Sequence, residues 1–206
     1  MRLPRFYPIF DGAGWLRRML PLGVGLVQLR IKDRPAAEIR SEIASARDLC
    51  ARHGARLVIN DYWREAIDLG CDFVHLGQED LDGADLPALR RAGVRFGIST
   101  HDEAELERAL GCEPDYVALG PIYPTRLKKM KWHSQGLDRL RAWRIRVGDL
   151  PLVAIGGMSP DRAEGAFAAG ADIISVVTDI TLHPDPEART TEWLRVTREE
   201  QAHAGG

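Results

Sequence analysis

Two aspartates, each following a short apolar run, are the residues of this sequence best suited to chemistry. Asp61 follows Arg56–Ile59, and Asp80 ends the polar segment Gln78-Glu79-Asp80 after Phe73–Leu76. Apolar residues at helical spacing between the two runs predict a strand–helix–strand unit whose parallel strands end on one side of a sheet. Adjacent carboxylates repel each other unless a proton or a metal lies between them, so the pair is suited to holding Mg²⁺ with substrate phosphates. The alternative is that both aspartates cap helices.

Two cations follow the second apolar run of the chain. With the side-chain period of a strand, Gln28, Arg30 and Lys32 lie on one face, and the apolar residues between them lie on the other. An inward-facing Arg needs an anion, and a diphosphate would supply one for the planar fork of Arg and the point charge of Lys. Two alternatives stay open: Arg30 forms a structural ion pair with Asp11 or Asp61, or Lys32 is a solvated surface residue.

Polar residues and glycines follow the later apolar runs as well. Ser99 is placed to donate to a phosphate or a substrate ring, with capping of the helix that begins at Asp102 as the alternative. Gly156-Gly157 lets a backbone approach a phosphate ahead of a helix, and Thr178 would complete that site, although Gly-Gly is also typical of tight turns. The cationic segment 126–131 is a solvated face, a support for a leaving group or a lid.

These residues need a scaffold that brings their strand ends together. Eight strand-like runs alternate with helical patterns, which favours a single closed (β/α)₈ TIM barrel over a doubly wound open sheet. Such barrels carry their chemistry at the C-terminal ends of the strands. We expect one domain over residues 1–206, with 202–206 as a disordered tail. The predicted strands are Phe6–Phe10, Val24–Leu29, Arg56–Ile59, Phe73–Leu76, Val94–Ile98, Tyr116–Leu119, Leu152–Ile155 and Ile173–Val177.

The composition narrows the class of protein. A formal net charge of −2 over 206 residues argues against nucleic-acid binding and against binding to a membrane surface. No apolar stretch approaches the length of a membrane span, and no signal peptide is evident. Cys50, Cys71 and Cys112 form neither a disulfide framework nor a zinc pattern, which favours a cytoplasmic protein. The sequence leaves homo-oligomer formation open.

Taken together, the motifs at the predicted strand ends resemble those of the thiamine phosphate synthase family over nearly the whole chain. The matching segments are VQLRIK (27–32), VINDYWREAIDLGCDFVHLGQEDL (58–81), GISTH (97–101), DYVALGPIYPT (115–125), VAIGGM (153–158) and AGADIISVV (169–177). Members of this family are (β/α)₈ barrels that join a hydroxymethylpyrimidine diphosphate to a thiazole phosphate and release diphosphate. The resemblance implies a dissociative reaction in which Mg²⁺ and cations stabilise the departing diphosphate, with little need for a general base.

The resemblance also assigns residues to these small-molecule substrates. It implies that Asp61 and Asp80 bind Mg²⁺, and that Arg30, Lys128 and Ser99 act in catalysis. The pyrimidine-diphosphate contacts that it implies are Gln28, Arg30, Lys32, Asn60, Ser99 and Lys128. Around the thiazole phosphate it implies Thr125, Gly157, Val177 and Thr178.

The chain departs from the family pattern at a few positions. Leu127 stands where Thr is common, and Thr178-Asp179 stands where Ser-Ala is common. One alternative is therefore a non-catalytic relative that binds a thiamine precursor, and another is a thiazole tautomerase-like enzyme. The tautomerase branch typically carries His where this chain has Pro121, so the sequence favours the synthase.

Overall fold

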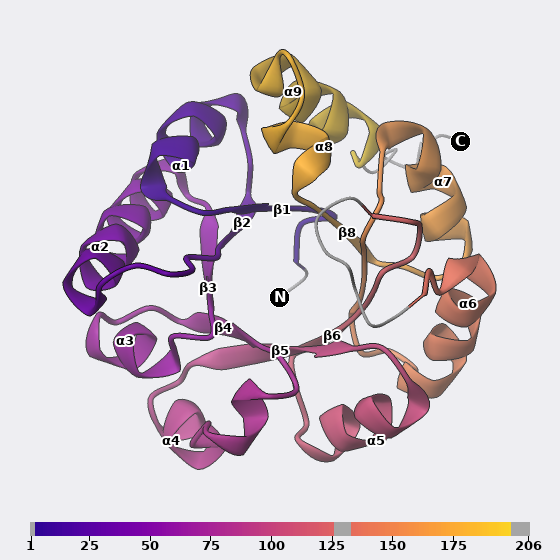
Figure 1. Cartoon of the computed structure of the whole chain (residues 1–206), viewed down its shortest axis with the longest axis horizontal. Coiled ribbons are helices and arrows are strands. Elements are labelled where there is room, and N and C mark those ends of the chain that lie inside the picture. The colour runs from indigo at the N-terminus through magenta and orange to yellow at the C-terminus, as the bar shows by residue number, and fades with distance from the viewer. Residues whose placement is uncertain (1–2, 126–132, 199–206) are drawn as a thin grey trace, which may run out of the picture.

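The computed structural model describes residues 3–125 and 133–198. In these ranges the chain forms a closed barrel in which each strand is parallel to its neighbours, and the first and last strands pair to close the ring. Figure 1 shows the strands as an inner ring with the helices around it. The strands are β1 (Phe6–Phe10), β2 (Leu26–Leu29), β3 (Arg56–Asn60), β4 (Phe73–Leu76), β5 (Arg95–Thr100), β6 (Tyr116–Leu119), β7 (Leu152–Ile155) and β8 (Ile173–Val176).

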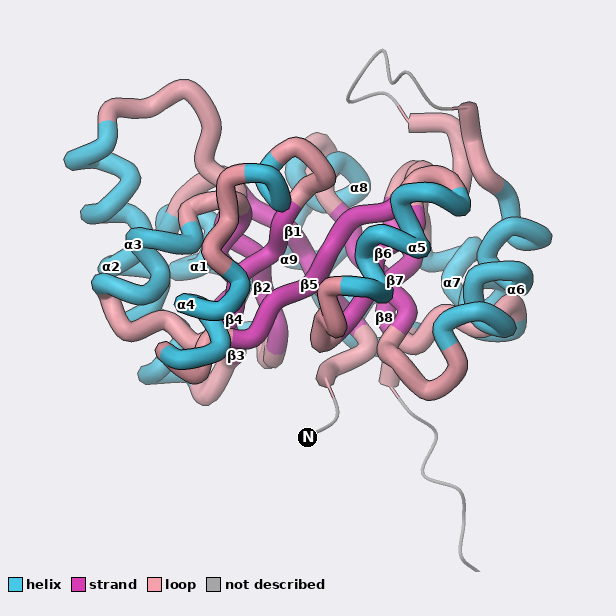
Figure 2. Tube along the Cα trace, turned by 90° about the horizontal axis from the view of Figure 1, so that it is seen from below, coloured by secondary structure: helices cyan, strands magenta, loops and turns pink. Residues whose placement is uncertain are grey.

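Helices cover the outside of this barrel and return the chain from one strand to the next (Figure 2). They are α1 (Ala13–Met19), α2 (Ala36–His53), α3 (Trp63–Asp68), α4 (Leu86–Arg91), α5 (Glu103–Gly111), α6 (Gly136–Val147), α7 (Pro160–Ala168), α8 (Thr178–Thr181) and α9 (Pro186–Val196). Two 3₁₀ turns, η1 (Leu20–Leu22) and η2 (Asp80–Asp82), accompany them. The predicted (β/α)₈ barrel is thereby confirmed, and the alternative of an open doubly wound sheet is wrong.

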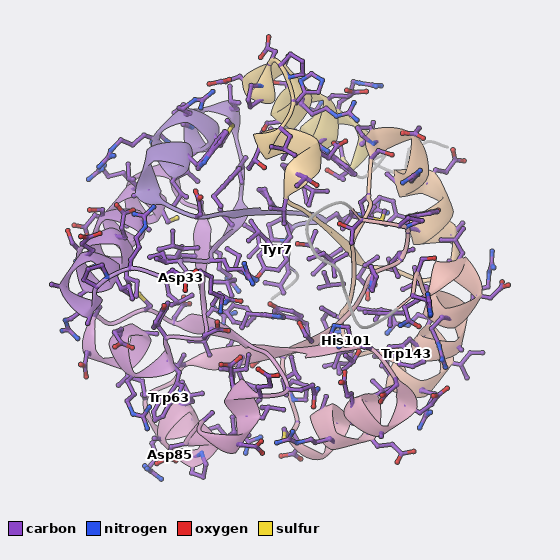
Figure 3. The ribbon with its side chains drawn as sticks, viewed as in Figure 1. Tyr7, Asp33, Trp63, Asp85, His101 and Trp143 are labelled. Carbon is purple, nitrogen blue, oxygen red and sulfur yellow. The ribbon has the colours of Figure 1, made fainter. Side chains whose placement is uncertain are left out.

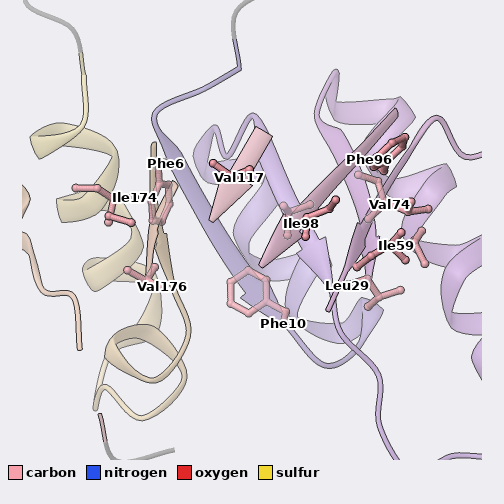
Figure 4. Packing of buried hydrophobic residues seen from close by; sticks show 14 of the residues in the cluster. Phe6, Phe10, Leu29, Ile59, Val74, Phe96, Ile98, Val117, Ile174 and Val176 are labelled. Atoms are coloured by element: carbon pink, nitrogen blue, oxygen red, sulfur yellow. The ribbon is translucent and has the colours of Figure 1, made fainter. Parts of the chain in front are cut away.

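Alternation along the strands separates two buried layers. Phe6 and Phe10 of β1 pack against the helices, whereas Tyr7 between them points into the barrel. Figure 4 shows the outer layer, in which Ile59, Val74 and other strand residues pack together. The interior is also filled, because large side chains from most of the strands meet there. Its apolar cluster consists of Tyr7, Leu26, Val58, Phe73, Tyr116, Ala118, Val153 and Ile173.

Three aspartates brace the end of the barrel at which the strands begin, here called the amino edge. Asp72 precedes β4 and accepts a hydrogen bond of 2.6 Å from Arg95. Asp115 precedes β6 and accepts from the N–H of Phe96, and Asp172 precedes β8 and accepts from the N–H of Leu152 at 2.8 Å. Each of these carboxylates therefore ties the start of its strand to the start of a neighbouring strand.

The remaining expectations about organisation have different outcomes. Within the described ranges, no helix has the length and apolar character needed to cross a membrane. The predicted tail 202–206 lies outside those ranges, and the division into one domain stays a prediction. The short helix α8 was not expected, and it begins where Thr178 was placed in a loop.

Candidate active site

A polar cavity lies inside the barrel near the end at which the strands finish, here called the carboxyl edge. Its volume is about 110 Å³. Four residues predicted from the sequence line it, namely Gln28, Arg30, Asn60 and Ser99. Its other polar lining residues, Tyr7, His75 and Ser175, were not predicted. Its remaining lining residues are Ile9, Ala118, Val153 and Ile155, so all eight strands contribute to the cavity.

The predicted face of β2 is confirmed. Gln28 is 2% exposed inside the barrel, whereas Arg30 lies further out along the same face and is exposed. No ion pair joins Arg30 to any described residue, so the alternative of a structural pair with Asp11 or Asp61 is wrong for the part of the chain that the structure describes. Lys32, at the rim, donates instead to the carboxylate of Asp61.

Asp61 and Asp80 lie next to each other, as the strand–helix–strand unit predicts. Burial raises the pKa of the Asp80 carboxyl, and the negative charge of Asp61 raises it further. Opposing effects come from the N–H of Gly77, which donates to Asp80 at 3.0 Å, and from the Lys32 ammonium. The two carboxylates thus repel each other, with one ammonium beside them.

Neither aspartate acts as the helix cap that was the alternative. Helix α3 begins after Tyr62, and no side chain caps it. Asp61 adopts a left-handed backbone conformation with φ of 65°, which Asp tolerates better than most residues. Its N–H donates to the carbonyl of His75 at 2.9 Å, so the backbone of β4 fixes its position. Asp80 lies in η2 and closes the loop after β4 through Gly77.

These carboxylates fit a magnesium ion that substrate phosphates help to bind. Mg²⁺ prefers oxygen ligands and is commonly held by one or two carboxylates together with phosphate oxygens and water. Among the described residues, no group of three or more His, Cys, Asp or Glu side chains is arranged to hold a metal. The pair would supply two carboxylate ligands to such an ion.

Ser99 belongs to a hydrogen-bond network that crosses the barrel interior. Its Oγ lies 2.8 Å from Nε2 of His75, and Nδ1 of His75 lies 2.7 Å from the hydroxyl of Tyr116. The Tyr116 and Tyr7 hydroxyls are 3.0 Å apart, and Nε2 of Gln28 donates to Tyr7 at 2.8 Å. Figure 3 labels Tyr7 within the ring of strands. We call these five residues the interior network.

The members of the interior network are neutral. Burial lowers the pKa of His75 to about 4, against the opposing effect of the Asp61 charge. Burial likewise raises the pKa of both Tyr7 and Tyr116, so their hydroxyls keep their protons.

The alternative that Ser99 caps α5 is wrong, because Asp102 caps this helix by accepting from the N–H of Glu105.

The loop after β7 lies against the loop after β6. Gly156 and Gly157 both have positive φ, at 96° and 63°. A Cβ on Gly156 would lie 2.6 Å from Pro121, and one on Gly157 would lie 2.5 Å from the carbonyl oxygen of Pro124. This packing requires glycine at both positions. It also brings Gly157 close to Thr125, the residue that follows Pro124.

Comparison with known proteins agrees with this geometry. A family model described as thiamine monophosphate synthase matches residues 9–180. The chain belongs to this family. It is an enzyme, a transferase of thiamine biosynthesis that acts on small molecules.

Individual members of the family are similar over almost their full length. A thiamine-phosphate synthase from Rhizobium etli is 61% identical over 197 residues, which cover 96% of this chain and 97% of that protein. One from Serratia proteamaculans is 47% identical over 190 residues, 92% of this chain and 90% of that protein. The solved thiamine phosphate pyrophosphorylase from Pyrococcus furiosus is 26% identical with a TM-score of 0.82, covering 94% of this chain and 95% of that one.

The departure from the thiamine monophosphate synthase pattern at Asp179 has a structural explanation. The carboxylate of Asp179 accepts two hydrogen bonds of 2.8 Å from Arg189 and one of 2.6 Å from the indole N–H of Trp193. Asp179 therefore anchors α8 to α9 and does not cap a helix.

The residues expected around the thiazole phosphate lie in the segments that follow the strands at the carboxyl edge. Val177 directly precedes α8, and Thr178 is its first residue. The strands that carry these loops, β7 and β8, are neighbours, so Gly157, Val177 and Thr178 belong to one side of the barrel. Lys128 and Leu127 lie outside the described residues.

Proposed function

We propose that this enzyme joins 4-amino-2-methyl-5-hydroxymethylpyrimidine diphosphate to 4-methyl-5-hydroxyethylthiazole phosphate, giving thiamine phosphate and diphosphate. The observation that supports this most is the junction of three features at one edge of the barrel. A small cavity lined by polar side chains suits a flat ring, and the carboxylate pair suits a metal. Arg30, which lines the cavity, supplies a cation that pairs with no carboxylate among the described residues.

In this proposal the pyrimidine ring enters the cavity and its diphosphate extends toward the rim. Gln28, Asn60 and Ser99 contact the ring, because their side chains line the cavity. Arg30 then faces the diphosphate with its planar fork of donors. Lys32, which pairs with Asp61, would contact the outer phosphate.

Asp61 and Asp80 would hold Mg²⁺ in this arrangement. When bound, the ion would neutralise charge that develops on the departing diphosphate. Lys32 donates to the same Asp61 carboxylate, so its ammonium would also lie near the diphosphate. Lys128, which lies outside the described residues, would add a further cation for the diphosphate.

The reaction then has two steps, in which the diphosphate leaves first and the thiazole nitrogen attacks second. The bond between the pyrimidine methylene carbon and the diphosphate oxygen breaks, and both electrons leave with the diphosphate. The thiazole nitrogen donates its lone pair to the resulting cation and forms the new carbon–nitrogen bond. Electrostatic support from fixed charges is what such a step requires, and it needs no general base.

Gly157, Val177, Thr178 and Thr125 would hold the phosphate of the thiazole. Backbone N–H groups of the loops after β7 and β8 are suited to this, as in many barrels.

The alternative of a non-catalytic relative loses its support from Asp179, because that carboxylate accepts hydrogen bonds from Arg189 and Trp193. Pro121, which stands where the tautomerase branch typically carries His, packs against Gly156. A cytoplasmic location stays a prediction.

The proposal is tested by mixing the purified protein with both substrates and Mg²⁺, then following thiamine phosphate and diphosphate together. We expect equal amounts of the two products, and neither product when one substrate is omitted. Diphosphate release without thiamine phosphate, or binding of both substrates without turnover, would contradict the proposal.

A further inference from the structure

The interior network has a direction, which follows from counting its protons. Nε2 of Gln28 donates to Tyr7, so the Tyr7 proton is directed to Tyr116. The Tyr116 proton is in turn directed to Nδ1 of His75. A neutral imidazole carries one N–H, which leaves the proton on Nε2 to donate to Ser99.

The two ends of this network consequently have opposite hydrogen-bonding character. Gln28 uses an N–H within the network, so its Oε1 can accept from a ligand in the cavity. Ser99 accepts from His75, so its own hydroxyl proton can be donated to that ligand. Reversing one end requires every proton between the two ends to reverse as well.

The barrel is built to hold the middle of this network in place. Gly97 of β5 lies between His75 and Tyr116 in the strand register. A Cβ on Gly97 would lie 2.1 Å from the Tyr116 ring, so the glycine leaves the space that the ring fills. The rings of Tyr116 and His75 stack with centroids 5.6 Å apart and planes 14° apart.

A further polar group points to a ligand in the same cavity. Ser175 is 1% exposed and lines the cavity, and its Oγ has no hydrogen-bond partner among the described residues. A buried hydroxyl without a partner is unfavourable, so a ligand polar atom there would be stabilising. The register places Ser175 beside Tyr7, next to the interior network.

We propose that Tyr7, Tyr116 and His75 are positioning residues that fix Gln28 as an acceptor and Ser99 as a donor toward the substrate ring. Resting on the proposed function, this assigns the specificity for an aminopyrimidine, whose amino group donates to Gln28 while a ring nitrogen accepts from Ser99. An oxo analogue presents the opposite pattern, an acceptor oxygen and a ring N–H. It would require the whole network to reverse.

The test compares the amino and oxo forms of the pyrimidine diphosphate in wild type and Tyr116→Phe. Removing the Tyr116 hydroxyl breaks the hydrogen-bond chain between Gln28 and Ser99. We therefore expect the KM for the amino substrate to rise about tenfold. The preference for amino over oxo should fall by about the same factor, while the KM for the thiazole phosphate stays unchanged. Thr190→Val, which removes a buried hydroxyl bonded to Met19 outside the site, is the control.

A spectroscopic measurement tests the direction without turnover. Nitrogen-15 NMR of the His75 ring, assigned with His75→Gln, should show the proton on Nε2. A proton on Nδ1, or a Tyr116→Phe variant with wild-type KM and wild-type preference, would overturn the proposal. If Tyr116→Phe does not fold, Tyr7→Phe breaks the same network and carries the same expectations.

Failure of the proposed function is distinguishable from failure of this inference. A wild-type protein that makes no thiamine phosphate contradicts the function alone. Calorimetric binding of the two pyrimidine diphosphates then still measures the amino preference and its loss in Tyr116→Phe. Equal binding of both forms by the wild type would overturn the network assignment.

Discussion

The carboxylates at the two edges of this barrel have opposite electrostatic surroundings. At the amino edge, Asp172 accepts from Arg144 and from the N–H of Leu152, so its charge is matched within the protein. At the carboxyl edge, Asp80 has another carboxylate as its neighbour, and its pKa is raised. The difference teaches that the amino edge is arranged for stability and the carboxyl edge for a partner that the protein itself does not supply.

The largest expected effect comes from Asp80→Ala. Removing one carboxylate of the pair should lower Mg²⁺-dependent turnover by on the order of 1,000-fold, because a preorganised electrostatic contact to the leaving group is lost. The fold should survive, since Asp80 lies at the rim and not in the core. Steady-state kinetics and circular dichroism measure both. Near-normal turnover would show that Asp80 is not a metal ligand.

Arg30→Ala should have the next largest effect. The fork of donors for the diphosphate is lost, so we expect kcat to fall about 100-fold. Arg95→Ala is the matched control, because Arg95 pairs with Asp72 at the amino edge. Equal losses of activity in the two variants would remove the distinction between the edges.

Asp172→Ala should affect stability and not chemistry. The variant loses the ion pair with Arg144 and a hydrogen bond to the backbone of β7, and both groups are partly exposed. We expect the free energy of unfolding in urea to fall by about 1–2 kcal/mol. Turnover per folded molecule should match the wild type. A selective loss of kcat would place chemistry at the amino edge.

The smallest expected effect concerns His75 and pH. Its folded pKa of about 4 lies below the usual 6.5, so between these values the unfolded chain binds a proton that the folded protein does not. Stability is therefore fully present above pH 6.5 and is lost as the pH falls. The free energy of unfolding should drop by about 1 kcal/mol from pH 7 to pH 5.5 because of this residue. Urea unfolding of wild type and His75→Gln tests this, since the variant should lack that contribution.

Much of the scaffold was predictable from local pattern. Apolar runs such as Phe73–Leu76 and Tyr116–Leu119 match strands residue for residue. The side-chain period along β2 placed Gln28 and Arg30 on the inward face. Asp61 and Asp80 could be paired because one short crossover joins their strands. Helix α8, with four residues, is too short to show helical periodicity.

The interior network could not be found in this way. Tyr7, His75 and Tyr116 belong to three strands that are far apart in the sequence, and periodicity gives the face of a residue without its neighbours across a barrel. The only clue in the sequence was that the side-chain period places each of these three residues on the inward face of its strand. The role of Asp179 could not be predicted for a related reason, because its partner Arg189 lies on the next helix.

The measurement that tests the central claim most directly is a magnesium titration of diphosphate release, with both substrates present, for wild type and Asp80→Asn. Release by the wild type should require the metal, and the variant should approach saturation only at a much higher Mg²⁺ concentration. Wild-type release that persists in a chelator, or equal half-saturating concentrations in the two proteins, would contradict the claim that the carboxyl edge acts through a metal held by Asp61 and Asp80.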